Sequence, residues 1–382
     1  MTQSRVLHVF KYFHPRFTGE GIFVERLAAH FGALRPDVIH DVVAIATPRP
    51  ANPAMPSGFG AVHYLGSGAR EATQRTLIMW LARNARRYRA IHYHSHVDRT
   101  FLASLFLRLS GIRLLLSATL DDSVPGLLQT YRPAFRPVVK LLLRSINRFI
   151  AISRKLFEEN NRFVPAAHSE FLPVGVAIPE LDAERRASAR ETLGLPADGL
   201  VLVSVGGICP RKNQLFLVEQ LPRLVRTYPA LVLLLVGPVL DTAYRDSIAE
   251  RIAELGLGHN VRFCGQTDRP WDFYAAADIM VFASRMEGFG TVVIEAMAYG
   301  LPVVARHLPG VNDMFITHGR SGYLFSDCEQ FREGVEQLAA SPGLRQAMGI
   351  SGRDFVASHY DISAIAARYL ALYGFPATAG TA

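Results

Sequence analysis

Apolar residues along the chain gather in short, nearly continuous runs, separated by segments in which they recur every three or four positions. The runs of strand length are residues 5–10, 42–46, 90–96, 113–119 and 148–153, then 200–207, 231–237, 261–265, 278–284 and 301–305. Runs that are apolar throughout are typical of parallel strands covered on both faces. Helical segments between them include residues 21–34, 99–110, 243–256 and 291–300. This strand–helix rhythm occurs twice and predicts two doubly wound α/β domains.

The segment 172–199 is rich in Pro, Gly and charged residues and predicts a hinge region between the two domains. The length of 382 residues is sufficient for two cores. Open α/β sheets bind ligands beyond the carboxyl ends of their strands, and two such domains can face each other across a cleft. We therefore look for chemistry in the strand-to-helix loops.

Composition places the chain among globular proteins, with 49% hydrophobic and 19% charged residues. Three cysteines, none in a C-x-x-C spacing, argue against a disulfide framework and fit a reducing compartment. No apolar run reaches the ~18–20 residues of a membrane span, and the first residues enter a strand pattern without a signal-peptide core. These features predict a soluble, cytoplasmic protein.

The net charge of +8 is unevenly distributed. Residues 1–180 hold 23 Lys and Arg against 12 Asp and Glu, a balance of +11, and the remainder holds 18 against 21, a balance of −3. The basic residues concentrate in 83–89 and 132–149. This asymmetry suggests an anionic partner: a membrane surface, a nucleic acid or an anionic substrate. The apolar residues interleaved in 132–149 suit an interfacial helix on anionic lipid, although a solvated helix face explains them equally well.

The loop and helix "EGFGTVVIEAMAYG" combine glycines with two acids, Glu287 and Glu295. Gly288 and Gly290 let the backbone approach a ligand, and the helix that starts near Thr291 offers unpaired N–H groups to an anion. Glu295 lies about one turn inside that helix, ~6 Å along its axis. A carboxylate there can accept hydrogen bonds from a ribose diol, and Glu287 would face the other end of the ligand. A local cap or salt bridge is the structural alternative for Glu295.

The stretch 284–305 resembles the Glu-x7-Glu signature of the retaining glycosyltransferases with two Rossmann-like domains, the GT-B fold of family 4 type. The resemblance continues through 308–325, 203–213, 149–159 and 172–176, in the family's order along almost the whole chain. It implies an N-terminal acceptor-binding domain, residues 1–178, with a C-terminal helix, 360–382, that crosses back to it. Residues 179–359 would form the nucleotide-sugar donor domain.

The resemblance also assigns residues to the donor. Arg211 and Lys212, which follow the strand that ends near Gly207, stand at the family's basic pair for the donor diphosphate, with the Phe289–Thr291 amides beside them. Glu295 would hold the ribose, and Glu287 would hold hydroxyls of the transferred sugar.

The sequence "TGEG" near residue 20 stands where the family has a Gly-Gly loop that approaches the donor phosphates. Gly19 therefore belongs to the implied donor site. Glu20 departs from the family pattern, and because a carboxylate repels phosphate we expect it to point away or to meet the acceptor.

A second departure is Asp121, which stands where many relatives have a histidine. It can orient or deprotonate an acceptor hydroxyl, although Asp122 could act instead, or Asp121 could cap a helix with Ser123. His92, His94 and His96 alternate along one strand, which makes a metal conceivable, but no acid cluster follows them. No Asp-x-Asp occurs in the chain. We expect metal-independent chemistry and no cofactor.

The sequence thus predicts a retaining glycosyltransferase that moves a sugar from a nucleotide-diphosphate sugar to an acceptor hydroxyl. The basic first half favours a lipid-linked or polysaccharide acceptor in envelope or exopolysaccharide synthesis. The protein would be cytoplasmic, able to lie peripherally on the inner face of the membrane through its N-terminal domain. Two alternatives stay open: a nucleotide-sugar epimerase or phosphorylase of the same fold, and a basic nucleic-acid-binding protein. The latter lacks any RRM, KH or helix-turn-helix signature, so we expect no nucleic acid partner.

Overall fold

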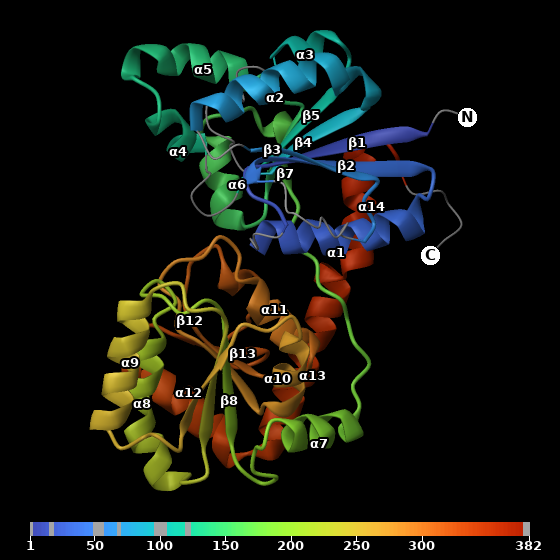
Figure 1. Cartoon of the computed structure of the whole chain (residues 1–382). Helices are drawn as coiled ribbons and strands as arrows, with labels where there is room; N and C mark the ends of the chain where they lie inside the picture. Colours follow the sequence, from blue (N-terminus) through green and yellow to red (C-terminus); the bar gives the residue numbers. More distant parts are fainter. Residues whose placement is uncertain are drawn as a thin grey trace. The chain divides into compact units, whose positions relative to one another are not determined.

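The protein divides into two compact units, shown in a computed structural model (Figure 1). One unit comprises Met1–Gly175 and Ile362–Ala382, and the other comprises Val176–Asp361. These boundaries lie two or three residues from the 178/179 and 359/360 boundaries expected from the sequence. The structure describes residues 3–14, 19–48, 57–66, 70–94, 105–118 and 124–376.

The first unit is built on a seven-stranded parallel sheet with the order β3-β2-β1-β4-β5-β6-β7. Its strands are β1 (Ser4–Phe10), β2 (Val38–Pro48), β3 (Ala61–Gly66), β4 (Ala90–His94), β5 (Arg113–Ala118), β6 (Arg148–Ala151) and β7 (Ser169–Phe171). The order reverses between β1 and β4, which is the topological switch point of a doubly wound sheet. Functional loops are expected beyond the carboxyl ends of these two strands.

Helices cover both faces of this sheet (Figure 1). They are α1 (Gly19–Leu34), α2 (Arg70–Asn84), α3 (Leu105–Leu109), α4 (Val124–Gln129), α5 (Arg136–Leu143), α6 (Arg154–Asn161) and α14 (Ile362–Tyr373). Figure 1 shows α1 and α14 on one face and α2, α3 and α5 on the other. The chain therefore returns to the first unit for its last helix.

The second unit holds a six-stranded parallel sheet with the order β10-β9-β8-β11-β12-β13. Its strands are β8 (Val201–Val205), β9 (Val232–Val236), β10 (Val261–Gly265), β11 (Ile279–Phe282), β12 (Val303–Arg306) and β13 (Gly322–Phe325). Its helices are α7 (Ala183–Thr192), α8 (Gln214–Thr227), α9 (Thr242–Glu254), α10 (Pro270–Ala276), α11 (Thr291–Ala298), α12 (Cys328–Ala340) and α13 (Pro342–Tyr360).

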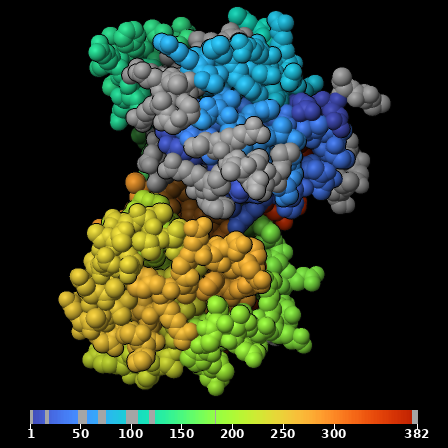
Figure 2. All heavy atoms as spheres, in the orientation of Figure 1, coloured from blue at the N-terminus to red at the C-terminus, as the bar shows by residue number. Residues whose placement is uncertain are grey.

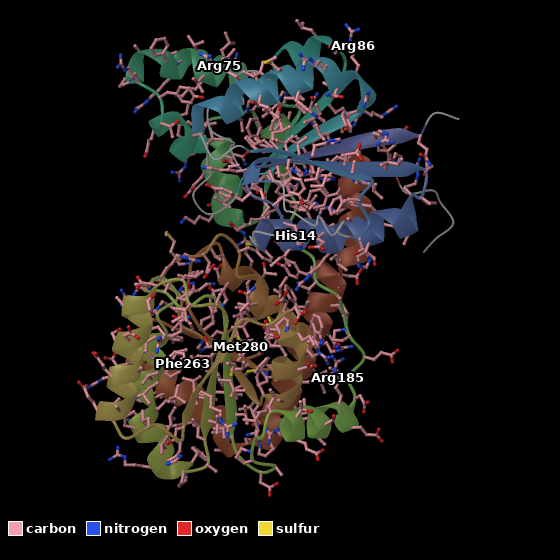
Figure 3. The ribbon with its side chains drawn as sticks, in the orientation of Figure 1. His14, Arg75, Arg86, Arg185, Phe263 and Met280 are labelled. Atoms are coloured by element: carbon pink, nitrogen blue, oxygen red, sulfur yellow. The ribbon has the colours of Figure 1, made fainter. Side chains whose placement is uncertain are left out.

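Burial in the second unit follows the strand order. Met280 on the central strand β11 is fully buried, whereas Phe263 on the edge strand β10 is 38% exposed (Figure 3). Leucines and valines of β8, β9 and β11 pack against α8, α9 and α12 in one continuous core. The continuous apolar runs of these strands are explained by helices on both faces of the sheet.

The predicted fold class is confirmed, since both sheets are parallel and helix-covered. The hinge prediction is wrong for part of 172–199, because this segment contains α7, which is packed into the second unit. Arg190 of α7 is buried and forms an ion pair with Asp278 at 2.7 Å. The charged composition that suggested a linker reflects this ion pairing and the exposed face of a short helix.

Candidate functional site

The loops that follow β8 and β11 lie side by side, because these strands are neighbours in the second sheet. The first loop carries Arg211 and Lys212, and the second carries Glu287. The backbone N–H of Arg285 donates a hydrogen bond to the carbonyl of Arg211 at 2.9 Å, which fastens one loop to the other. The basic pair and the acid predicted from the sequence are thereby brought together at the carboxyl-terminal ends of β8 and β11.

Glu287 is the centre of this arrangement. Its Oε1 lies 2.6 Å from Nζ of Lys212 and 3.0 Å from a terminal nitrogen of Arg211. The hydroxyl of Ser284 donates to the same oxygen at 2.6 Å. The Glu287 side chain is only 10% exposed, whereas the Arg211 side chain is 34% exposed. Two cations meet one anion here, so the cluster has a surplus positive charge that an anionic ligand can share.

The backbone conformation of Asn213 helps to position the loop that carries Arg211 and Lys212. Asn213 adopts the left-handed conformation (φ 59°) immediately before α8 and donates its side-chain amide to the carbonyl of Ala283 at 3.3 Å. Asparagine tolerates this conformation better than most residues. Gly207, also predicted at the donor site, lies in the same loop, where its carbonyl accepts a hydrogen bond from the Gln214 side chain at 3.0 Å.

The loop from Gly288 to Gly290 leads directly into α11, which begins at Thr291. Gly290 precedes the helix in the left-handed region (φ 90°), and a side chain would strain that turn. Phe289 is buried against Phe315 and Tyr360, so only its backbone can serve a ligand. A helix leaves N–H groups of its first turn without intrahelical partners, so the start of α11 is where the sequence predicts an anion, and this site stays a prediction.

Glu295 has a protein partner. The phenol of the buried Tyr274 donates a hydrogen bond to its Oε2 at 2.9 Å. This bond fixes the carboxylate one turn inside α11, where the sequence placed a ribose-binding acid. Its local structural role and its predicted ligand role are compatible, because a carboxylate has several acceptor sites.

In the first unit, Gly19 is the first residue of α1, and residues 15–18 before it lie outside the described parts. Glu20 lies with a carboxylate oxygen 3.4 Å from Nδ1 of the buried His94. Asp121 and His96, both singled out by the sequence, also lie outside the described residues.

Four histidines form a buried network in this unit. His8 Nδ1 is 2.9 Å from His94 Nε2, and His8 Nε2 is 2.9 Å from His40 Nδ1. His92 contacts the hydroxyl of Tyr373 at 2.8 Å and that of Ser117 at 2.7 Å. Strand register explains the gathering, because His8 of β1 pairs with His92 of β4. The Tyr373 contact also attaches α14 to the sheet.

Burial keeps these histidines neutral. It lowers the pKa of His40 and of His94 to about 3. The pKa of His8 and of His92 also falls well below the ordinary value, through burial first and through neighbouring imidazoles second. The carboxylate of Glu20 favours a proton on the facing Nδ1 of His94, so its Nε2 accepts from His8, which in turn accepts from His40.

The same cluster contains a candidate metal triad among the described residues, His8, His92 and His94, with ligand atoms within 4.8 Å of one another. Their ring nitrogens already have protein partners at hydrogen-bond distance. We therefore interpret the cluster as a neutral hydrogen-bonded network that supports the fold.

Sequence reasoning missed Ser284, Tyr274, His8 and His40. Only the spacing of Ser284, three residues before Glu287, offered a signal. The others lie far along the chain from their partners, and finding them requires the strand order.

Two doubly wound parallel α/β units, with cations and acids at the carboxyl edge of the second sheet, define the GT-B class of fold. Residues 185–355 match the family model for glycosyl transferases group 1. The match covers most of the second unit, including the Glu287 cluster and α11.

Curated relatives are similar to this chain over a comparable number of residues. The chain is 33% identical over 185 residues to the lipopolysaccharide core biosynthesis glycosyltransferase LpsE of Rhizobium meliloti, covering 48% of this chain and 52% of that one. It is 32% identical over 213 residues to the GDP-mannose-dependent alpha-(1-6)-phosphatidylinositol monomannoside mannosyltransferase of Mycolicibacterium smegmatis, covering 52% and 54%. The match thus spans about half the length of these relatives.

The fold extends over the whole chain. The Anabaena protein HepE, solved in complex with UDP and glucose, matches with a TM-score of 0.77 over 97% of this chain and 99% of its own, at 18% sequence identity. Similarity at this level of identity concerns the fold. Among the described residues, no helix has the length and apolar character needed to cross a bilayer.

Proposed function

We propose that the protein is a retaining glycosyltransferase that moves a sugar from a nucleoside diphosphate sugar to an acceptor hydroxyl. The observation that carries the proposal is the pairing of Lys212 and Arg211 with Glu287 beside the start of α11. A diphosphate would share the two cations with Glu287 and approach the amides of the helix end. The matching family and the named glycosyltransferase relatives support this assignment.

In the proposed reaction the bond between the sugar's anomeric carbon and the diphosphate oxygen breaks, and the diphosphate leaves with the electron pair. The acceptor oxygen forms the new bond on the same face, and its proton passes to a leaving phosphate oxygen. Arg211 and Lys212 would stabilise the charge that develops on the diphosphate. Glu287 would hold sugar hydroxyls, and Glu295 the ribose. These positioning roles need no metal, which is part of the proposal.

The acceptor is proposed to be lipid-linked or a polysaccharide, in envelope or exopolysaccharide synthesis, with the protein on the inner face of the membrane. One relative is named for lipopolysaccharide core synthesis and another for a phosphatidylinositol mannoside, which supports an acceptor of this kind. The complex of HepE with UDP and glucose supports a nucleotide sugar as donor. Asp121 is proposed to orient the acceptor hydroxyl. An Asp121→Asn variant with wild-type turnover would return it to a capping role.

The test is a donor screen with UDP-, GDP- and ADP-sugars, a bacterial lipid extract as acceptor, and measurement of nucleoside diphosphate release. We expect one donor class to be consumed, with retained configuration in the product. The Lys212→Ala variant should be inactive, while Arg226→Ala, which removes an exposed cation of α8, should stay active.

Two results would contradict the proposal. A monomeric sugar product formed without acceptor would indicate an epimerase or phosphorylase. Salt-dependent nucleic acid binding together with no nucleotide-sugar turnover would indicate a binding protein.

A further inference from the structure

Helix α5 presents large apolar side chains to solvent. Phe135, just before the helix, is 59% exposed, Val138 is 53% exposed and Leu141 is 62% exposed. Their spacing of three residues places them along one side of the helix. Val139 and Leu143 are buried on the opposite side, so α5 is packed on the first unit by one stripe only. Single exposed apolar residues are ordinary, but three within seven residues form a patch that favours a partner.

Basic residues accompany this patch at every fourth position: Arg132, Arg136, Lys140, Arg144 and Arg148. Residues 124–149 contain no Asp or Glu, so no acid in this segment neutralises them. Arg132, Lys140 and Arg144 are exposed. We define the α5 surface as Arg132, Phe135, Val138, Lys140, Leu141 and Arg144. Figure 2 shows the atoms of this segment, in green, at the edge of the first unit.

We propose that the α5 surface docks on an anionic phospholipid surface. Apolar side chains beside Lys and Arg are the composition with which interfacial helices insert between headgroups. Phe135, Val138 and Leu141 would enter the acyl boundary, and the neighbouring cations would remain among the phosphates. An acidic protein would satisfy the cations but would gain nothing specific from the apolar ridge, and a second copy of this chain would bring like charges together.

Hydrogen bonds from α3 hold the end of α5 in place. Arg108, at the end of α3, donates hydrogen bonds to the carbonyls of Arg144 at 3.3 Å and Ser145 at 3.0 Å, just beyond the end of α5. The adjacent Leu109 is 91% exposed. The docking helix is therefore attached to the sheet domain, and binding would orient the first unit as a whole. The inference rests on the proposed function in one respect: a lipid-linked acceptor would be presented at that same surface.

The experiment is co-sedimentation of the full chain with vesicles of phosphatidylcholine, alone or mixed with phosphatidylglycerol. We expect binding to the mixed vesicles that weakens with added salt. The triple variant Phe135→Ser, Val138→Ser, Leu141→Ser and the triple variant Arg132→Glu, Lys140→Glu, Arg144→Glu should each lose at least about tenfold in affinity. These residues are exposed, and unchanged thermal unfolding would confirm that the variants fold.

Matched controls change residues of the second unit. Leu181→Ser with Ile350→Ser removes exposed apolar side chains, and Arg226→Glu with Arg320→Glu reverses exposed charges. Both pairs should bind vesicles as the wild type does. Equal binding of the α5 variants, equal binding to neutral vesicles, or no binding would overturn the inference. So would a wild-type dimer in solution that the apolar variant dissociates.

The two proposals fail separately. If the α5 variants lose binding to vesicles but keep their affinity for nucleoside diphosphates, the docking surface is supported independently of catalysis. If the wild type binds vesicles but no nucleotide, the proposed function fails and the docking surface stands.

Discussion

At the scale of single residues, Glu287 connects the two loops of the candidate site that follow β8 and β11. It contacts both cations and a hydroxyl through one oxygen, Oε1, and it is mostly buried. The sequence indicated the two acids and the basic pair, because glycines and a resemblance marked their loops. The sequence did not indicate that Arg211 and Lys212 would form ion pairs with Glu287, since their loops come together only because β8 and β11 are neighbours in the sheet.

We predict that Glu287→Ala separates binding from transfer. Its removal frees Lys212 and Arg211, so affinity for a nucleoside diphosphate should be unchanged or tighter. Transfer should fall at least about 100-fold, because sugar positioning is lost. Calorimetry and a transfer assay measure the two effects, with the exposed acid Glu333→Ala as control. Full transfer activity in Glu287→Ala would refute the assignment.

Glu295 is predicted to hold the ribose, and its bond with Tyr274 provides a sharp comparison. Glu295→Ala should weaken nucleotide binding at least about tenfold, a loss of about 1.4 kcal/mol. Tyr274→Phe removes the phenol but keeps the carboxylate, so its effect on affinity should be much smaller. Unchanged affinity in Glu295→Ala would leave the residue with a structural role only.

At the scale of elements, close backbone contacts hold together the loops that follow the strands of the second sheet. Gly237, which follows β9, has φ 146°, and a Cβ there would lie 2.3 Å from the carbonyl oxygen of Gly206. We predict that Gly237→Ala destabilises the protein by at least about 2 kcal/mol. Gly258 has open space and no positive φ, so Gly258→Ala is the matched control in thermal unfolding. Equal melting temperatures for both variants would contradict the predicted steric clash between a side chain at position 237 and Gly206.

The histidine network predicts a pH-dependent first unit. Each histidine has a folded-state pKa below its ordinary 6.5, about 3 for His40 and His94. The unfolded chain therefore binds more protons, and stability is present above pH 6.5 and lost as pH falls toward 3. Each neutral histidine should contribute a slope of about 1.4 kcal/mol per pH unit in that window.

Unfolding measured between pH 7.5 and 5.5 tests this expectation. His40→Asn should flatten the slope, whereas His359→Gln, at an exposed position, should leave it unchanged. A stability that does not vary across this range would show that the histidines are not held neutral.

At the scale of the whole molecule, the sequence predicted the fold class well. The ten apolar runs correspond to strands because helices cover both faces of each sheet, so most of these strands are apolar throughout. β3, β7 and β13 were not predicted, since all three are edge strands whose residues are only partly buried. The histidine network could not be predicted, because it depends on the β2-β1-β4 order that no local pattern encodes.

The central claim is that the second unit binds a nucleoside diphosphate through Arg211 and Lys212. The most direct measurement is calorimetry of the full chain with UDP, GDP and ADP and the matching monophosphates, without metal. The account predicts that one diphosphate binds at least about tenfold more tightly than its monophosphate, and that Arg211→Ala with Lys212→Ala abolishes the difference. Equal affinity for the two phosphates, or no binding of any nucleotide, would contradict it.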